Sequence, residues 1–185
     1  NRMTGDGAEK AYDSMRMFFN VASNKKYFKR FFYFGSGIEY GKEKPIRNFD
    51  ENNFGKRVPQ SNWGLYKYIC AKYAESSADF LNLRIFGAFG KYEDIRVRFI
   101  SNSICKNLLN LPIIINQNIR MDYLYINDLV KIIEFFMKNK NRFSAYNLTP
   151  GKSIDLVTIA RIINSVSDKS VPIKIIAFWL SRCLV

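Results

Sequence analysis

The sequence predicts an α/β fold in which helices flank a mainly parallel sheet. Two observations predict it: short apolar runs alternate along the chain with amphipathic stretches of helical period, and most apolar runs end in glycine or a polar residue. The length of 185 residues, 48% of them hydrophobic, is enough for one sizeable core and short for two independent domains.

The first half of the chain alternates helix and strand. The opening helix repeats apolar side chains at Tyr12, Met15, Phe19 and Ala22, and the first strand is the run RFFYFGS. The second helix has Ser61 or Asn62 as its candidate cap. In chain order we predict a helix at 8–23, a strand at 30–36, an irregular segment at 37–61, a helix at 62–77 and a strand at 79–90.

The second half continues the alternation with shorter strands. Ser153 is the predicted cap of its last helix, and residues 177–185 form an apolar tail without a turn or cap. In chain order we predict a helix at 93–109, strands at 112–116 and 122–126, a helix at 128–139, a strand at 145–149, a helix at 154–167 and a strand at 171–176.

Composition excludes several classes of chemistry. The chain has no histidine, which removes Ser–His–Asp and Cys–His catalysis and the commonest metal ligand. Its three cysteines, Cys70, Cys105 and Cys183, are far apart and form no CxxC pair, so we expect neither a disulfide framework nor a metal site. No apolar run approaches the roughly 20 residues of a membrane span, and no secretory signal is visible, so we expect a cytoplasmic protein.

The net charge of +13, from 29 basic and 16 acidic residues, has two explanations that stay open. It favours a polyanionic or phosphate-bearing partner. It also fits a genome rich in A and T, which raises Lys, Asn, Ile and Phe together. The basic residues are scattered and no nucleic-acid-binding motif accompanies them, so we do not expect nucleic acid as the partner.

Five segments carry the chemistry. The first follows a predicted strand, the second opens the next helix and the third leaves the next strand, so all three fall at the C-terminal strand ends, where open parallel sheets bind ligands. In order they are GSGIEYG, WGLYK, LRIFGAFG, MDYLYIND and YNLTPG. They resemble the patterns SSxxVYG, YGxSK, LRxFNxYG, RDFxYVxD and YNxGxG of the extended short-chain dehydrogenases/reductases, the sugar-nucleotide epimerases, dehydratases and reductases. The resemblance runs from about residue 8 to about residue 175.

This resemblance implies a role for each matching residue. Ser36 matches the serine that hydrogen-bonds the reacting oxygen of the substrate. Lys67 matches the lysine that binds the nicotinamide ribose, and Trp63 stands at the catalytic tyrosine. The segment that lies against the nicotinamide corresponds to Phe86, Gly87 and Ala88.

The resemblance also implies partners and an architecture. Whole relatives use NAD or NADP, act on a nucleotide-diphospho-sugar, and dimerise through the helices that correspond to 8–23 and 62–77. The implied fold is a truncated Rossmann-like core with a small C-terminal substrate lobe. We expect a partial cofactor-binding core at 1–110, without the glycine-rich first βαβ unit, and a mixed core and substrate lobe at 111–176.

The main departure from these patterns is Trp63. A lysine ammonium beside a tyrosine lowers the pKa of the phenol from about 10 and makes it a base near neutrality. An indole N–H is only a donor, so Trp63 cannot accept the proton. Tyr68 and Lys72 form an alternative Tyr-x-x-x-Lys pair, although Pro59 and the spacing from Ser36 favour the register of Trp63.

Two further positions depart from the family. Epimerase–reductases that make fucose-type sugars use a cysteine where this chain has Ile38, together with a histidine, so enolisation by that pair is not expected. The usual arginine of the fourth pattern is Met121 here. Arg120, one residue earlier, is the candidate for the substrate diphosphate, on the opposite face of a strand.

We therefore expect an NAD(P)-dependent nucleotide-sugar epimerase or reductase, impaired by the loss of the tyrosine and of the glycine-rich unit. Two alternatives stay open. One is a non-catalytic remnant or binding subunit that needs a partner, and the weaker one is a basic nucleic-acid-binding protein.

Overall fold

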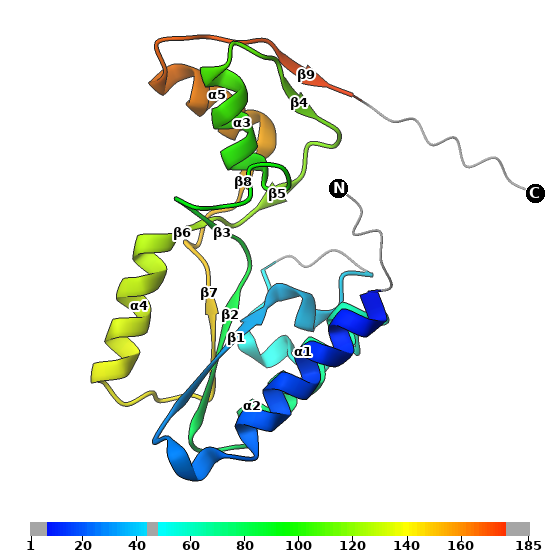
Figure 1. The fold of residues 1–185 in the computed structure, drawn as a ribbon, viewed down its shortest axis with the longest axis vertical. Coiled ribbons are helices and arrows are strands. Elements are labelled where there is room, and N and C mark those ends of the chain that lie inside the picture. Colours follow the sequence, from blue (N-terminus) through cyan, green and yellow to red (C-terminus); the bar gives the residue numbers. More distant parts are fainter. Residues whose placement is uncertain (1–6, 44–47, 177–185) are drawn as a thin grey trace, which may run out of the picture. The chain divides into compact units, whose positions relative to one another are not determined.

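A computed structural model describes residues 7–43 and 48–176, which fall into two compact units (Figure 1). The sheet unit consists of residues 7–86 and 128–149, and the second unit consists of residues 87–127 and 150–176. Each unit is described by itself. Cys183 and the predicted tail at 177–185 lie outside the described residues.

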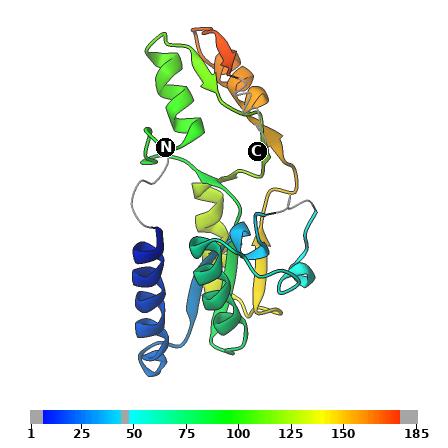
Figure 2. The ribbon, with the colours of Figure 1, turned by 90° about the vertical axis from the view of Figure 1, so that its right-hand side faces the viewer.

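The sheet unit is built on a parallel sheet of three strands in the order β1-β2-β7, which confirms the predicted α/β class. Ser36 at the end of β1 lies beside Ile85 at the end of β2. Helices α1 and α2 cover one face of the sheet and α4 covers the other (Figures 1 and 2). The strands and α-helices are α1 (Gly7–Ala22), β1 (Phe31–Ser36), α2 (Asn62–Glu75), β2 (Phe80–Ile85), α4 (Ile126–Lys138, from residue 128 on in this unit) and β7 (Ala145–Leu148).

Three short 3-10 helices complete the sheet unit. They are η1 (Lys25–Tyr27), η2 (Gly37–Tyr40) and η3 (Glu51–Asn53). Of these, η2 follows directly on Ser36, and the hydroxyl of Ser36 accepts a hydrogen bond from the backbone N–H of Ile38 at 3.4 Å. The chain therefore makes a tight turn directly after the last residue of β1.

Aromatic packing holds α1 and α2 on the sheet. Phe18 of α1 is buried and makes edge-to-face contacts with Tyr33 at 5.0 Å and Tyr73 at 5.9 Å between ring centroids. Alanines at the helix interface, among them Ala71 and Ala74, are fully buried, which lets the two helices approach closely. Helix α1 was predicted correctly, but its buried stripe is displaced from the predicted one: Ala11, Phe18 and Ala22 are buried, whereas Tyr12 is 60% exposed.

Arg30 joins the start of β1 to the C-terminal end of α4. Its guanidinium donates hydrogen bonds to the carbonyls of Phe136 and Asn139 and to the side chain of Asn141. The C-terminal carbonyls of a helix lack intrahelical donors and attract positive charge, so Arg30 stabilises this helix end.

The second unit contains three two-stranded pairs and two helices. The pairs β3-β6 and β4-β9 are parallel, and β5-β8 is antiparallel. Its core joins Ile113 and Ile115 to the buried face of α5, which includes Ile159, Ala160 and Ile163. The elements are β3 (Ala88–Phe89), α3 (Phe99–Leu108), β4 (Ile113–Ile115), β5 (Arg120–Met121), β6 (Leu124–Tyr125), β8 (Ile154–Asp155), α5 (Leu156–Val166) and β9 (Ile173–Ile175).

Three predicted elements differ from the structure. The strand at 79–90 is interrupted after Ile85. Just beyond the break, Gly87 lies against the backbone of Asp122, where a Cβ would be 2.7 Å from the carbonyl oxygen. The helix at 93–109 begins only at Phe99, after a turn in which Asp94 binds Arg96. The helix at 154–167 begins at Leu156, and its cap is Asp155 rather than Ser153.

Among the described residues, no helix is both long enough and apolar enough to cross a membrane.

Candidate functional site

The candidate site lies where β1 and β2 end side by side in the sheet unit. Ser36 is half-buried at the end of β1 and caps η2. Because its oxygen already accepts the Ile38 N–H, the hydroxyl proton of Ser36 can be donated to a ligand oxygen. The ring of Phe86, which follows β2, lies against Gly37, where a Cβ would be 2.6 Å from a ring carbon. The absence of a side chain at Gly37 therefore brings Phe86 close to Ser36.

Lys67 reaches the same end of the sheet from α2. Its ammonium donates a hydrogen bond of 2.8 Å to the carbonyl oxygen of Phe34, two residues before Ser36. It also lies 5.0 Å from the ring centroid of Tyr33 and 5.6 Å from that of Tyr66, in cation–π geometry. Burial lowers the pKa of the Lys67 ammonium, while the negative charge of Glu39 raises it.

Trp63 lies one turn before Lys67 on α2. Its half-buried ring packs edge-to-face on Tyr66, with 5.4 Å between ring centroids, and against the apolar cluster of α1 and α2. The helix that carries both residues is capped by Ser61, whose hydroxyl accepts the N–H of Gly64 at 3.1 Å. Ser61 is thus the cap among the two residues considered from the sequence.

The other tyrosines near Lys67 do not supply the missing base. Burial raises the pKa of Tyr33 and that of Tyr66, so both phenols keep their protons at neutral pH. Burial also raises the pKa of the Cys70 thiol to about 11, which leaves it a poor nucleophile. The chemistry available around Lys67 is therefore hydrogen-bond donation and positive charge.

The alternative Tyr-x-x-x-Lys pair, Tyr68 and Lys72, lies in another part of the sheet unit. The ammonium of Lys72 lies 4.8 Å from the ring centroid of Phe54 and 5.6 Å from that of Tyr68, beside the loop that follows η3. Lys67, by contrast, is hydrogen-bonded to β1. This geometry favours the register of Trp63 and Lys67.

Three of the residues named from the sequence lie in the second unit. Gly87 and Ala88 lead into and form β3, and Arg120 lies on β5. Arg120 is exposed, donates a 2.9 Å hydrogen bond to the carbonyl of Ser153, and lies 4.0 Å from a carboxylate oxygen of Asp155. Ser36, Trp63, Lys67 and Phe86 belong to the sheet unit.

Sequence reasoning missed a buried ionic cluster directly behind Ser36. Arg84 and Glu39 are fully buried and joined by a 2.7 Å ion pair, and Arg84 also pairs with Glu75 near the end of α2. Charged residues in a sequence are normally read as solvated. The available signal was Glu39 itself, at the position where the pattern SSxxVYG has valine. No group of three or more acidic, cysteine or histidine side chains among the described residues could hold a metal ion.

Three comparisons with known proteins show what the chain is similar to. A family model described as "NAD dependent epimerase/dehydratase family" matches residues 9–149. ADP-L-glycero-D-manno-heptose-6-epimerase of Brachyspira hyodysenteriae (strain ATCC 49526 / WA1) is 26% identical over 182 residues, which cover 90% of this chain and 55% of that protein. The chain thus spans about half the length of this curated relative.

Two solved structures show the same fold. UDP-N-acetylglucosamine 4-epimerase from Methanobrevibacter ruminantium M1 has a TM-score of 0.72 at 23% identity, over 88% of this chain and 55% of that one. MlghC, the GDP-mannoheptose C4 reductase from Campylobacter jejuni with NADP bound, has a TM-score of 0.79 at 15% identity, over 92% of this chain and 67% of that one.

Proposed function

The chain belongs to the NAD-dependent epimerase/dehydratase family, and on that premise we propose that it takes part in NAD(P)-dependent epimerisation or reduction of a nucleotide-diphospho-sugar. The observation that carries this proposal is the approach of Lys67 to the end of β1, where Ser36 presents its hydroxyl. The similar proteins named above act on UDP-, ADP- and GDP-linked sugars, which supports the substrate class.

The side chains at this end of the sheet fit the ribose of a nicotinamide cofactor. An ammonium has three donors, and Phe34 uses one of them, so Lys67 retains donors for ribose hydroxyls. Phe86 offers an apolar ring near Ser36, against which a flat heterocycle packs. When bound, NAD or NADP supplies hydride transfer at a sugar carbon.

The residues of the chain then act on the oxygen of that carbon. Ser36 donates its hydroxyl proton in a hydrogen bond to this oxygen, and the ammonium of Lys67 favours negative charge on it. Trp63 can donate its indole N–H but cannot take up a proton. We therefore propose that acid–base catalysis is impaired in this chain, while binding and orientation of the sugar are retained.

Two lysines on α2 provide a matched test of this proposal. We expect Lys67→Ala to weaken NADH and NADPH binding at least tenfold, measured by fluorescence titration, because the ribose loses its charged donor. Lys72→Ala, one turn and a half further along the helix, should bind as the parent does. Equal losses in both variants would contradict the assignment of Lys67.

The alternatives predict other results in the same experiment. Binding of UDP-N-acetylglucosamine or a GDP-linked heptose without any cofactor binding at millimolar concentration would support a non-catalytic binding subunit. Salt-dependent retention on DNA, with no sugar-nucleotide binding, would support a basic nucleic-acid-binding protein.

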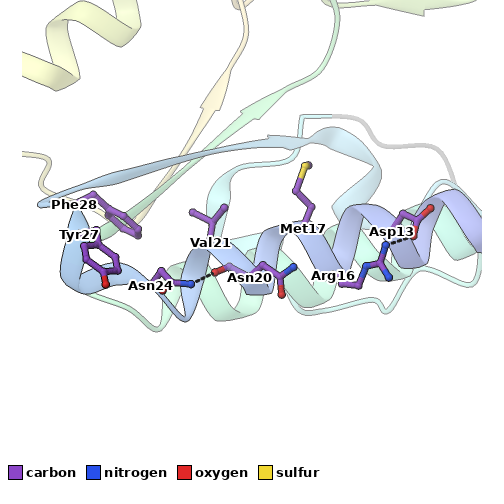
Figure 3. A pocket seen from close by; sticks show the side chains of 8 residues that line it. All are labelled: Asp13, Arg16, Met17, Asn20, Val21, Asn24, Tyr27 and Phe28. Atoms are coloured by element: carbon purple, nitrogen blue, oxygen red, sulfur yellow. Dashed lines mark hydrogen bonds and ion pairs between the residues drawn. The ribbon is translucent and has the colours of Figure 1, made fainter.

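We also propose a homodimer through the outer faces of α1 and α2, the helices expected from the sequence at 8–23 and 62–77. Exposed apolar side chains on these faces include Met17, at 65% exposure, and Leu65 and Ile69, at 38% each. A shallow hollow of about 480 Å³ runs along α1 to η1 (Figure 3), lined by Asp13, Arg16, Met17, Asn20, Val21, Asn24, Tyr27 and Phe28. A second copy of the chain would cover these side chains.

A further inference from the structure

The buried cluster behind Ser36 is built around the carboxylate of Glu39. One carboxylate oxygen accepts the backbone N–H of Ser36 at 2.8 Å, and the other accepts the amide of Asn82 at 3.0 Å and the guanidinium of Arg84 at 2.7 Å. All three contacts use the carboxyl group as an acceptor. Burial raises the pKa of Glu39, while the charge of Arg84 and the hydrogen bonds from Asn82 and Ser36 oppose this shift and favour the ionised form. Ser36 and Glu39 together form a capping box around η2.

Arg84 extends this cluster to the helix that carries Lys67. Besides Glu39, its guanidinium binds Glu75 at the end of α2, and it lies 4.1 Å from the ring centroid of Phe54. With Arg84 and Lys67 positive and Glu39 and Glu75 negative, the charges of the four groups cancel. A single buried arginine thus fixes the position of one carboxylate next to Ser36 and another on α2.

Gly35 provides the space that this carboxylate occupies. A Cβ at position 35 would lie 2.4 Å from a carboxylate oxygen of Glu39 and 2.2 Å from the side-chain oxygen of Asn82. The family pattern SSxxVYG has serine at position 35 and valine at position 39. Glu39 and Asn82, which are hydrogen-bonded to each other, both occupy the space of a side chain at 35, so the glycine at 35 accompanies the glutamate at 39.

We propose that Glu39 is a positioning residue for the Ser36–Lys67 pair. Gly35, which has no side chain, leaves room for the buried carboxylate of Glu39 at the end of β1. This role rests on the proposed function, because it concerns the same two side chains. Glu39 holds the backbone of Ser36 directly and acts on Lys67 through its charge.

The charge of Glu39 matters here because Trp63 cannot become an anion. In a chain with tyrosine at 63, a phenolate would be the negative group beside the ammonium. The ammonium of Lys67 lies beside the rings of Tyr33 from β1 and Tyr66 from α2. The charges of Glu39 from η2 and of Cys70 from α2 also act on its pKa. Both phenols and the thiol are neutral at pH 7, so Glu39 supplies the negative charge that favours the protonated form of Lys67.

The first experiment measures the pKa of Lys67 by NMR titration of lysine labelled with ¹³C and ¹⁵N, with the signal assigned by Lys67→Arg. We expect Glu39→Gln to lower this pKa, because the substitution keeps the shape and removes the charge. Glu134→Gln, the same change at an exposed position of α4, is the control and should leave it unchanged. An equal Lys67 pKa in the parent and both variants would overturn the proposal.

The second experiment is a double-mutant cycle of urea unfolding over Gly35→Ser and Glu39→Val. We expect Gly35→Ser alone to lower the unfolding midpoint strongly, and the double variant to lose less than the two single changes combined. Additive effects would refute the pairing of Gly35 with Glu39. If Glu39→Gln does not fold, the double variant takes its place in the titration, and a Lys67 pKa equal to that of the parent would count against the proposal.

Neither experiment uses cofactor or sugar, so the two proposals fail separately. The proposed function is rejected if Lys67→Ala and Lys72→Ala change the affinity for NADH and NADPH equally. An unchanged Lys67 pKa rejects the role of Glu39 even where the cofactor binds.

Discussion

At position 63, an indole stands one helical turn before Lys67, where the family pattern has a phenol. The structure places this ring against Tyr66 and the apolar cluster of α1 and α2, so the tryptophan contributes packing to the helix layer. The neighbouring phenols of Tyr33 and Tyr66 are buried and stay protonated. Restoring a phenol at 63 is thus the direct way to restore a base.

We expect Trp63→Tyr to raise sugar-nucleotide turnover by about 10²-fold or more, since a positioned acid–base group contributes about 10²- to 10⁴-fold. Turnover is measured by cofactor absorbance or by product analysis with NAD and with NADP. Trp63→Phe is the control, because it makes the same reduction in size without a hydroxyl and should bring no gain. With cofactor binding established by the fluorescence titration, an equal rate in both variants would show that a phenol at 63 has no catalytic role.

At the scale of elements, α2 depends on its cap. The hydroxyl of Ser61 accepts the Gly64 N–H, and Asn62, the other candidate, is already the first residue of the helix. We expect Ser61→Ala to lower the free energy of unfolding by about 1 kcal/mol in urea denaturation, as for other N-cap serines. Asn62→Ala should change it much less. A larger loss of unfolding free energy in Asn62→Ala than in Ser61→Ala would contradict the assignment of Ser61 as the cap.

The N-cap of α5, Asp155, is expected to make folding stability depend on pH. The carboxylate of Asp155 accepts the N–H of Thr158 at 2.9 Å and its hydroxyl at 2.8 Å, and these bonds lower the pKa of Asp155. A lowered folded-state pKa contributes stability that is present above about pH 4, the unfolded value, and is lost as pH falls through the folded value.

We therefore expect thermal unfolding of the parent to shift to lower temperature on acidification below about pH 4 more than that of Asp155→Asn, since asparagine also caps a helix but does not titrate. The measurement is circular dichroism at several pH values. Identical pH profiles for the two proteins would argue against a contribution from this carboxylate.

The helices and the main strands could be predicted from the sequence because periodicity records which side chains are buried. The exceptions depend on contacts distant in the sequence. Gly87, just after the break at Ile85, lies against the backbone of Asp122, and the cap residue Asp155 belongs to β8, which pairs with β5. For the site, the order of motifs located Ser36 and Lys67. The buried pair of Glu39 and Arg84 had one signal in the sequence, a glutamate where the pattern SSxxVYG has valine, but its partner on β2 could be identified only from the fold.

At the scale of the whole molecule, the proposed homodimer through the outer faces of α1 and α2 can be tested by substitution. We expect sedimentation to show a dimer in the parent and a monomer in the double variant Met17→Lys with Ile69→Lys, because charges placed in an apolar contact remain unpaired on association. Val130→Lys, an exposed apolar position on α4, is the control and should stay dimeric. A monomeric parent would contradict the proposed assembly.

The sheet unit is discontinuous in sequence, and this has a consequence for how the protein is made. Strand β7, which pairs with β2, and the carbonyls bound by Arg30 all come from residues 128–149, after the whole first segment of the second unit. A nascent chain that has left the ribosome only as far as residue 127 holds β1 and β2 but lacks the third strand and the helix that covers their open face. A chain synthesised only to this point therefore exposes apolar sheet surface, and this is the interval in which chaperones would bind it.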